Sequence, residues 1–314
     1  MSEHVAADHE GLRIAVVIVT YNSAAVIGDC LASLPAGAHG ARLTSVVVAD
    51  NASADDSVAI AERAAGEGLP VRVVQVGRNA GYAAAINAGV AALDLGALDA
   101  VMVLNPDCRV RPGTVTTLAQ ALGPAGRGIT APKLVNPDGS LQHSLHRTPA
   151  IFRALVTGLI GGGRAGRIGT LGEMSTDPRD YDGPQGAVWP WATGAAMMIS
   201  VRALREVGPW DESFFLYSEE TEYALRAADK GWTLWYEPSA MVEHIGGDSG
   251  TSPALAALLV VNKVRLFRKR RGALPAVPYY LAVILGESLR AVAGRRTSRA
   301  CVAALLRPSR VRMP

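Results

Sequence analysis

The sequence predicts an α/β protein with a mostly parallel, Rossmann-like sheet flanked by helices and a basic helical extension at the C-terminal end. Three observations lead to this fold class. Hydrophobic, β-branched runs alternate with amphipathic segments through the N-terminal half. Three of those runs end in polar residues. From residue 253 onward the pattern becomes helical and the charge strongly positive.

The elements of the N-terminal half follow one another in strand–helix order. Arg13–Thr20 (RIAVVIVT) is a continuous apolar run, as expected of a strand buried on both faces. Further strands are expected at Thr44–Ala49, Val71–Val76 and Ala100–Leu104, and helices at Ala24–Leu34, Asp55–Glu67 and Tyr82–Leu93. Such alternation is typical of a parallel, doubly wound sheet.

The second half is less regular. Residues 158–187 are rich in glycine, proline and charge, so we expect a mobile loop there. After it we expect a strand at Ala195–Val201, a helix at Ser218–Lys230 and a short strand at Trp232–Tyr236.

Composition sets broad limits. The chain has 314 residues, of which 49% are hydrophobic and 19% charged, so it can bury a sizeable core. Cys30, Cys108 and Cys301 stand singly, which predicts neither a disulfide framework nor a zinc site and fits a reducing cytoplasm. The polar, acidic start of the sequence is unlike a secretory signal peptide.

The C-terminal segment concentrates positive charge. Residues 263–314 contain 13 Lys and Arg and one acid, Glu287, and the net charge of the whole chain is only +3. A basic tail on a mildly acidic body suggests that the tail meets an anionic surface. The nucleic-acid alternative is disfavoured because aliphatic residues, rather than stacking aromatics, interleave these charges.

An uncharged stretch, residues 272–286, lies within this tail. It has 15 residues and two prolines, whereas a membrane-spanning helix needs about 20 apolar residues. Three alternatives stay open: the segment packs on the body, it lies on a membrane surface, or, least favoured by its length, it spans the membrane. The apolar residues available for the second are Leu281, Val283, Ile284 and Leu285.

The three polar strand ends are the strongest functional signal. They read Thr20-Tyr21-Asn22, Asp50-Asn51 and Asn105-Pro106-Asp107. Parallel strands bring these ends to one edge of the sheet, where ligands of open α/β sheets bind. Asp50 can accept hydrogen bonds from a base or a sugar, and Asp107 is a hard oxygen ligand suited to Mg²⁺ or Mn²⁺. The alternative for each residue alone is turn chemistry or helix capping.

The segment Gly77–Tyr82 follows the third expected strand. Its glycines would let backbone approach a ligand closely, although an ordinary strand-to-helix turn explains them equally well. Neither a dinucleotide fingerprint nor a P-loop occurs in the sequence.

Three carboxylates, Glu219, Glu220 and Glu222, stand at the start of an expected helix. One interpretation is charge complementarity with the helix dipole. The other is a general base that takes a proton from an acceptor hydroxyl. Aromatic residues just upstream would wall the pocket and raise a carboxyl pKa by desolvation. They are Trp210, Phe214, Phe215 and Tyr217.

His244 precedes a glycine-rich segment. A lone histidine is usually a packed or surface residue, but a neutral imidazole here can complete the shell of a metal held by Asp107.

Together these motifs resemble the family 2 glycosyltransferases, which have the GT-A fold. The resemblance runs from about Arg13 to Gly250, and its specificity lies in the order and spacing of the motifs. The matching segments are VTYN (19–22), ADNASADDS (49–57), GRNAGYAAAINAG (77–89), NPD (105–107), WATGAAMMI (191–199), FFLYSEETEYALR (214–226) and EH (243–244). The similarity is greatest to bacterial rhamnosyltransferases that act on polyprenyl-diphosphate-linked sugars.

The resemblance implies roles for individual residues. Asp50 would contact the nucleotide base. Asn105-Pro106-Asp107 stands in place of the DXD motif, from which it departs, with Asp107 and His244 on Mg²⁺ or Mn²⁺. Glu219-Glu220 stands in place of a Glu-Asp pair, so Glu220 is the implied base, with Glu219 and Glu222 as alternatives. The other implied nucleotide contacts are Thr20, Tyr21, Asn22, Asn79, Gly81 and Asn105, and the sugar contacts are Trp191, Thr193, Gly194 and Glu222.

The resemblance also implies an organisation and a setting. We expect a disordered tail at 1–11, a GT-A catalytic domain at 12–252 and a basic extension at 253–314 that packs on the body or associates with membrane. The implied reaction transfers a sugar, which we expect to be rhamnose from dTDP-rhamnose, to a hydroxyl of a lipid-linked or cell-envelope glycan. It inverts the configuration at the anomeric carbon and takes place at the cytoplasmic face of the membrane. No nucleic-acid partner is expected. A sugar nucleotidyltransferase would instead need a glycine-rich basic loop where Tyr21-Asn22-Ser23 stands.

Overall fold

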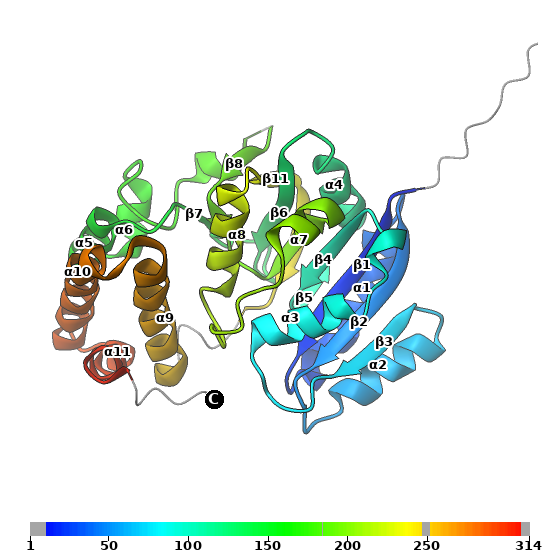
Figure 1. Cartoon of the computed structure of the whole chain (residues 1–314), viewed down its shortest axis with the longest axis horizontal. Coiled ribbons are helices and arrows are strands. Elements are labelled where there is room, and N and C mark those ends of the chain that lie inside the picture. Colours follow the sequence, from blue (N-terminus) through cyan, green and yellow to red (C-terminus); the bar gives the residue numbers. More distant parts are fainter. Residues whose placement is uncertain (1–10, 184, 247–251, 309–314) are drawn as a thin grey trace, which may run out of the picture.

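A single mixed sheet forms the centre of the molecule. The computed structural model describes residues 11–183, 185–246 and 252–308, so most of the expected disordered tail and the last six residues of the basic extension lie outside the described residues. Nine strands form the sheet, in the order β3-β2-β1-β4-β10-β6-β11-β5, with β8 paired to β11. Helices cover this sheet, and a separate helical layer lies beside it (Figure 1).

The N-terminal half confirms the expected parallel unit. Strand β1 (Arg13–Thr20) pairs in parallel with both β2 (Arg42–Asp50) and β4 (Ala100–Leu104), and β2 pairs in parallel with β3 (Val71–Gln75). The apolar side chains of β1 and β4 are almost fully buried, which explains their unbroken hydrophobic runs. The connecting helices are α1 (Ala24–Gly37), α2 (Ser57–Gly66) and α3 (Tyr82–Ala91). The three polar strand ends therefore share one edge.

The second half completes the sheet with mixed strand directions. Strand β10 (Ala196–Ser200) runs antiparallel between β4 and β6 (Arg127–Val135). The last strand, β11 (Thr233–His244), is much longer than the expected five residues because its far half pairs with β5 (Cys108–Val110). This pairing places His244, the last residue of β11, opposite Cys108. Other elements packed on or paired with this part of the sheet are α4 (Thr114–Ala121), β8 (Ala187–Trp189), α7 (Val201–Val207) and α8 (Glu219–Asp229).

The expectation of a mobile loop over residues 158–187 is wrong. The segment contains the end of α5 (Ile151–Ile160), the helix α6 (Gly162–Arg167) and a short 3₁₀ turn, η2 (Pro178–Asp180). Tyr181 anchors it, because its fully buried hydroxyl accepts from the backbone N–H of Leu145 and donates to a backbone carbonyl within the segment. Nearby, the two-residue strands β7 (Leu145–His146) and β9 (Trp191–Ala192) pair with each other. Glycine and proline here mark tight turns between packed pieces.

The C-terminal extension forms three helices: α9 (Pro253–Arg271), α10 (Ala273–Val292) and α11 (Arg296–Leu306). Together with α5 these three helices form the helical layer. The layer encloses a second core, separate from the hydrophobic residues packed on the sheet, that includes Phe267 and Tyr279. Val283, expected as a membrane contact, is buried in this core. No helix in the described part of the chain is long and apolar enough to cross a membrane.

Helix α9 docks onto the body of the molecule, which contains the sheet, through charge. The Lys263 ammonium lies 2.6 Å from a Glu173 carboxylate oxygen, and Arg270 pairs with Asp229 at 2.8 Å. Lys269 pairs with Asp211. Part of the basic charge in the tail therefore neutralises acids of the body, which supports the packing alternative for α9.

Helices α5 and α10 touch where each has a glycine. A β-carbon added at Gly286 would lie 2.5 Å from the Gly158 α-carbon, closer than packed atoms can approach. Gly286→Ala therefore has to push the two helices apart, and we expect it to lower the free energy of unfolding by about 1–3 kcal/mol.

Urea denaturation of the full chain measures this effect. Gly66→Ala in α2 is the matched control, because no atom lies within 4 Å of the added β-carbon. The control should be neutral or stabilising by up to about 1 kcal/mol, since alanine favours helix over glycine. Equal stability of the two variants would contradict the close helix contact.

Candidate active site at the strand ends

The ends of β1 and β2 are tied together by buried polar groups. The Thr20 hydroxyl donates to one oxygen of Asp50 over 3.0 Å, and the other Asp50 oxygen accepts from the Ser53 N–H, also at 3.0 Å. Thr20 and Asp50 are both buried. Asp50 therefore fixes the local geometry, while the neighbouring Tyr21 ring, 47% exposed, is the accessible group at this edge.

Asn22 shapes the turn after β1. Its backbone has φ of 51°, a left-handed conformation that asparagine tolerates better than most residues. Its N–H donates to the Ser53 hydroxyl, and its side-chain oxygen accepts from the Ala54 N–H at 2.8 Å. These bonds lock the turn after β1 to the turn after β2, so Asn22 holds the expected nucleotide pocket in shape.

Asn51, which the sequence analysis did not single out as a site residue, positions the Gly77–Tyr82 segment. Its amide donates to the Gly81 carbonyl at 3.2 Å and accepts from the Ala80 N–H at 3.3 Å. Within the segment, the Asn79 side chain accepts from the Gly81 N–H at 3.4 Å. The segment is thereby held against the end of β2.

Gly81 is required for a reason other than the one expected. Its φ is 91°, and a β-carbon there would lie 2.3 Å from the Phe215 carbonyl oxygen. The adjacent Tyr82 N–H donates to that same carbonyl at 2.8 Å. The close approach that this glycine permits is therefore to the backbone before α8, which joins the two halves of the site.

Tyr82 joins three parts of the site. Its hydroxyl lies 2.7 Å from the side-chain oxygen of Asn105 and 3.1 Å from the Gly194 carbonyl. Burial and the nearby carboxylates, Glu219 foremost, raise its pKa well above the usual value, so the phenol stays protonated. The start of α3, the end of β4 and the segment before β10 are thus linked through one hydroxyl.

Asp107 and His244 face each other across the β5–β11 end. The His244 Nε2 lies 3.5 Å from an Asp107 oxygen, and its Nδ1 lies 2.6 Å from the side-chain oxygen of Gln142. Because that oxygen only accepts, Nδ1 carries the proton and Nε2 presents a lone pair. Burial lowers the His244 pKa, which keeps the ring neutral. Two electron-pair donors therefore converge with no proton between them, an arrangement that fits a divalent cation.

Cys108 lies within the same group of potential ligands, whose donor atoms are within 4.8 Å of one another. Its sulfur donates to the Ala195 carbonyl, and burial raises its pKa well above the usual value. A protonated, buried thiol is a poor ligand for Mg²⁺ or Mn²⁺, which prefer oxygen ligands. Asp107 and His244 are therefore the residues that fit the cation.

Glu219 and Glu220 begin α8 after a strained turn. The two preceding residues, Tyr217 and Ser218, have φ of 67° and 78°, each costing about 1–3 kcal/mol. One carboxylate oxygen of each glutamate is buried without a hydrogen-bond partner among the described residues. Desolvation raises the pKa of both, and the charge of Glu220 raises that of Glu219 further. Strained backbone and carboxyl groups with shifted pKa values are frequent at functional sites, so this pair is a candidate for the base.

Gly194 makes room for Glu220. A β-carbon at Gly194 would lie 3.1 Å from the Glu220 β-carbon. Glu220 also lines a cavity of about 280 Å³ between α8 and the helical layer, whose wall includes Trp191, Tyr217 and Lys263. A hydroxyl entering this cavity can meet the carboxylate.

Glu222 is committed to a different role. Both of its oxygens accept from the Arg226 guanidinium at 3.0 to 3.1 Å, and the side chain is buried. Arg226 also donates to the carbonyls of Val207 and Pro209. Glu222 therefore braces the segment before α8 and is not available as the base.

Trp191 and Thr193 are held on the other wall. The Trp191 ring stacks on His146 with centroids 3.8 Å apart, and the His146 Nε2 lies 3.4 Å from the Thr193 hydroxyl. Burial, aided by Lys263 and Arg147, lowers the pKa of His146 to about 3, so the ring is neutral. Trp191, His146 and Glu220 thus line the same cavity, and Thr193 is held beside it by its contact with His146.

Asn262 of α9 supports the strained turn from behind. Its buried amide donates to the carbonyls of Leu216 at 2.9 Å and Tyr217 at 3.3 Å. No sequence motif includes Asn262, which lies in the tail, or Gln142, which lies between two motifs, so sequence alone does not point to either. Asn51 and Tyr82, in contrast, lie inside the recognised motifs.

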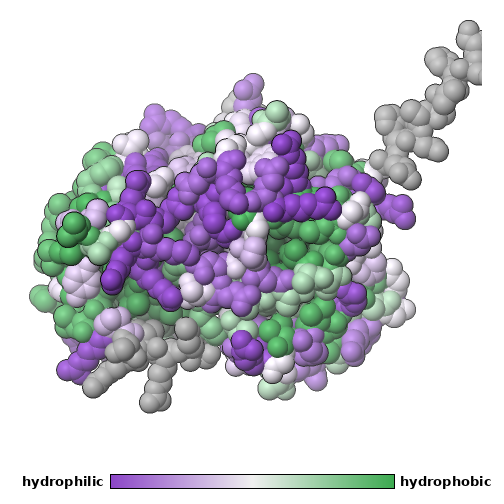
Figure 2. Space-filling view, in the orientation of Figure 1, coloured by the Kyte–Doolittle hydropathy of each residue, from purple (hydrophilic) through white to green (hydrophobic). Residues whose placement is uncertain are grey.

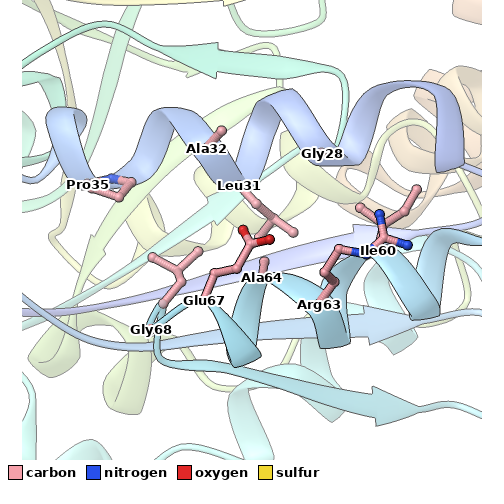
Figure 3. Close-up of a pocket in the computed structure, with 10 residues that line it drawn as sticks. Gly28, Leu31, Ala32, Pro35, Ile60, Arg63, Ala64, Glu67 and Gly68 are labelled. Carbon is pink, nitrogen blue, oxygen red and sulfur yellow. The ribbon is translucent and has the colours of Figure 1, made fainter.

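A second hollow, of about 480 Å³, lies elsewhere, between α1 and α2 (Figure 3). Apolar groups line most of it, with Arg63 and Glu67 at the side of α2, and no strand-end residue contributes. The converging polar groups described above make the strand-end edge the candidate site.

Comparisons with known proteins agree with this geometry. Residues 15–175 match the family described as Glycosyl transferase family 2, and residues 182–271 match Glycosyl transferase family group 2. The chain is 31% identical over 250 residues to the N-acetylglucosaminyl-diphospho-decaprenol L-rhamnosyltransferase of Mycobacterium tuberculosis, covering 76% of this chain and 78% of that protein.

Solved structures share the fold. A Pyrobaculum calidifontis mannosyltransferase in complex with GDP-Man and Mn²⁺ has a TM-score of 0.58 at 17% identity, covering 95% of this chain and 82% of that one. GalNAc-T7 with UDP, GalNAc and Mn²⁺ has a TM-score of 0.63 at 17% identity, covering 83% of this chain and about half, 48%, of that one. These likenesses confirm the GT-A type of sheet flanked by helices.

The cation pair generates a direct prediction. Asp107→Ala removes the charged oxygen, so Mn²⁺ should bind at least about tenfold more weakly, and His244→Ala should weaken it by about 10–100-fold. Titration followed by electron paramagnetic resonance measures free Mn²⁺ without an activity assay. Asp138→Ala, on an exposed turn, is the matched control and should bind as wild type does. Unchanged Mn²⁺ affinity in Asp107→Ala would contradict the assignment.

Proposed function

The chain belongs to glycosyl transferase family 2, and from that premise we propose that it transfers a sugar from a nucleotide-sugar to an acceptor hydroxyl with inversion, using Glu220 as the base. One observation carries the proposal. One oxygen of the Glu220 carboxylate is buried without a hydrogen-bond partner among the described residues, and the side chain lines a cavity. Gly194, which lies beside Glu220, is connected through the Tyr82 hydroxyl to Asn105 at the polar strand ends. A donor at those ends and an acceptor in the cavity would meet at this side chain.

The donor nucleotide would occupy the edge formed by β1, β2 and the Gly77–Tyr82 segment. Tyr21 offers an exposed ring to the base, and Asn79 offers an acceptor. Asp50 would act on the base through the turn that it holds, and Asn105 is held by Tyr82. Thr20, Asn22 and Gly81 keep that edge in shape. We assign dTDP-rhamnose as the donor, on the strength of the mycobacterial L-rhamnosyltransferase to which the chain is similar.

Asp107 and His244 would hold Mg²⁺ or Mn²⁺, the second of which is bound in the two solved structures. A divalent cation supplies positive charge that stabilises a leaving diphosphate. Gln142 orients the His244 ring toward Asp107, so the two side chains are already positioned to bind a cation.

The acceptor reaction is a proton transfer coupled to displacement. The acceptor oxygen forms a bond to the anomeric carbon as the bond to the nucleoside diphosphate breaks. Glu220 takes the hydroxyl proton, and its raised pKa makes it a stronger base than an exposed glutamate. Attack opposite the leaving group inverts the anomeric centre. Holding both substrates in one site supplies much of the rate.

The acceptor we propose is a lipid-linked sugar, as in the name of the mycobacterial relative. Trp191 lines the cavity where its sugar would sit, and Thr193 and Gly194 follow it closely in the chain. Glu222 keeps α8 in place through Arg226. We assign residues 12–252 as the catalytic domain and residues 253–314 as the extension. An acceptor confined to a bilayer places the enzyme at the cytoplasmic face of the cell membrane.

Removing the base tests the proposal. Glu220→Gln keeps the shape but cannot accept the proton, so kcat should fall by about 10²–10⁴-fold while donor binding stays near wild type. The same change removes a buried charge, so the melting temperature should rise. Steady-state release of nucleoside diphosphate and thermal unfolding measure the two effects. Glu219→Gln is the comparison, and a larger loss of kcat there would move the base to Glu219.

The pH dependence gives an independent check. Glu220 acts in its deprotonated form, and burial raises its pKa. Activity should therefore fall as pH drops through this raised pKa, at a higher pH than an ordinary glutamate would give. The acid limb of kcat/KM against pH measures this value, and a limb near pH 4 would contradict a desolvated base.

A further inference from the structure

Helix α10 presents a long apolar stripe to solvent. Six large hydrophobic residues recur along it at spacings of three or four, which places them on one side of the helix. They are 43–89% exposed: Leu274, Val277, Leu281, Leu285, Leu289 and Val292. The opposite side of α10, with Tyr279 and Val283, is buried in the second core. One side of the helix is thus packed in the core, and the opposite, solvent-exposed side is also apolar.

Helix α5 extends this surface. Phe152, Leu155, Leu159 and Ile160 are 38–57% exposed. The two helices meet at Gly158 and Gly286, so their exposed stripes adjoin. Together the six residues of α10 and these four of α5 form what we term the α5–α10 face. Figure 2 shows hydrophobic residues gathered at the end of the molecule where these helices lie in Figure 1.

Basic residues border this face at its ends. Arg271 precedes α10, while Arg295, Arg296 and Arg299 follow it, and all four are exposed. Within the described parts of the chain none of them forms a salt bridge, whereas Lys263, Lys269 and Arg270 of α9 pair with acids of the body. The cations left over therefore flank the apolar stripe.

We propose that the α5–α10 face binds the surface of an anionic phospholipid bilayer. An apolar stripe with Arg271 at one end and three arginines at the other suits a membrane interface, where leucines enter the acyl boundary and cations meet lipid phosphates. A second copy of the chain fits less well. An antiparallel two-fold pairing of α10 with itself would bring Arg271 of each copy toward the three arginines of the other, and like charges would repel.

The position of the face also suits the reaction, and this step alone rests on the proposed lipid-linked acceptor. A cavity of about 260 Å³ lies among α5, α9, α10 and α11, and its wall includes Arg290 and Arg295. It shares Thr157, Leu259 and Lys263 with the cavity that Glu220 lines. An acceptor held at the face by its lipid would therefore have a route between these helices toward Glu220.

Vesicle sedimentation with the full-length chain tests the proposal. Wild type should bind vesicles of phosphatidylcholine with 30% phosphatidylglycerol, and bind at least about tenfold more weakly to phosphatidylcholine alone or in high salt. The double variant Leu281→Glu/Leu285→Glu should lose at least about tenfold in affinity for the anionic vesicles. Val188→Glu, a similar change at a residue 58% exposed on β8, should bind as wild type.

Thermal unfolding checks that each variant is folded. We expect it to be, because the three substituted residues are 43–58% exposed. Wild type that ignores anionic vesicles at low salt, or a double variant that binds as well as wild type, overturns the proposal. So does a wild-type dimer, detected by analytical ultracentrifugation, that the double variant converts to monomer, because the face would then join two copies.

A separate assay keeps this test apart from the proposed function. Release of nucleoside diphosphate with a short-chain, detergent-dispersed acceptor needs no bilayer, so the double variant should match wild type there. Vesicle binding without any such release from wild type would contradict the proposed function while supporting the membrane face.

Discussion

Two consecutive carboxylates buried at the start of α8 impose the constraint on which the rest of the site depends. Among the described residues, one oxygen of Glu219 and one of Glu220 have no hydrogen-bond partner. This costs free energy when the carboxylates are charged, because a desolvated charge is poorly stabilised. Their raised pKa values mean that the folded state is stabilised when they are protonated and loses that stability as pH rises through those values. Gly194, the strained turn and Asn262 all serve to hold this pair in place.

The support comes from outside the sheet. Helix α9 reaches the strained turn through Asn262 and the neighbouring body through Lys269 and Arg270. The charge imbalance in the sequence thus has two structural consequences. Some cations dock the extension onto the body, and others remain exposed at the ends of α10. The helical layer is therefore both a wall of the cavity that Glu220 lines and an outer surface of the molecule.

The sequence predicted the sheet better than the site. Strands β1 and β4 begin and end at the expected residues, because unbroken β-branched runs occur only where both sheet faces are covered. Residues 158–187 were misread since glycine and proline also occur in compact turns, here anchored by Tyr181. The meeting of Asp107 with His244 depends on long-range β5–β11 pairing, and Gln142 and Asn262 act across more than 40 residues, so no local pattern reveals them. Only the family resemblance distinguished Glu220 from Glu219 and Glu222 as the base. The bonds between Glu222 and Arg226 became evident only in the structure.

In the proposed mechanism, the helical layer holds a desolvated base, Glu220, at the cavity where the acceptor would bind. The most direct test is the pH profile of kcat/KM for Asn262→Ala, which loses both carbonyl contacts but touches neither substrate. We expect water to reach Glu220, so the acid limb should move to lower pH and kcat should fall, while KM for the donor stays unchanged. An acid limb and a kcat identical to those of wild type would contradict the claim.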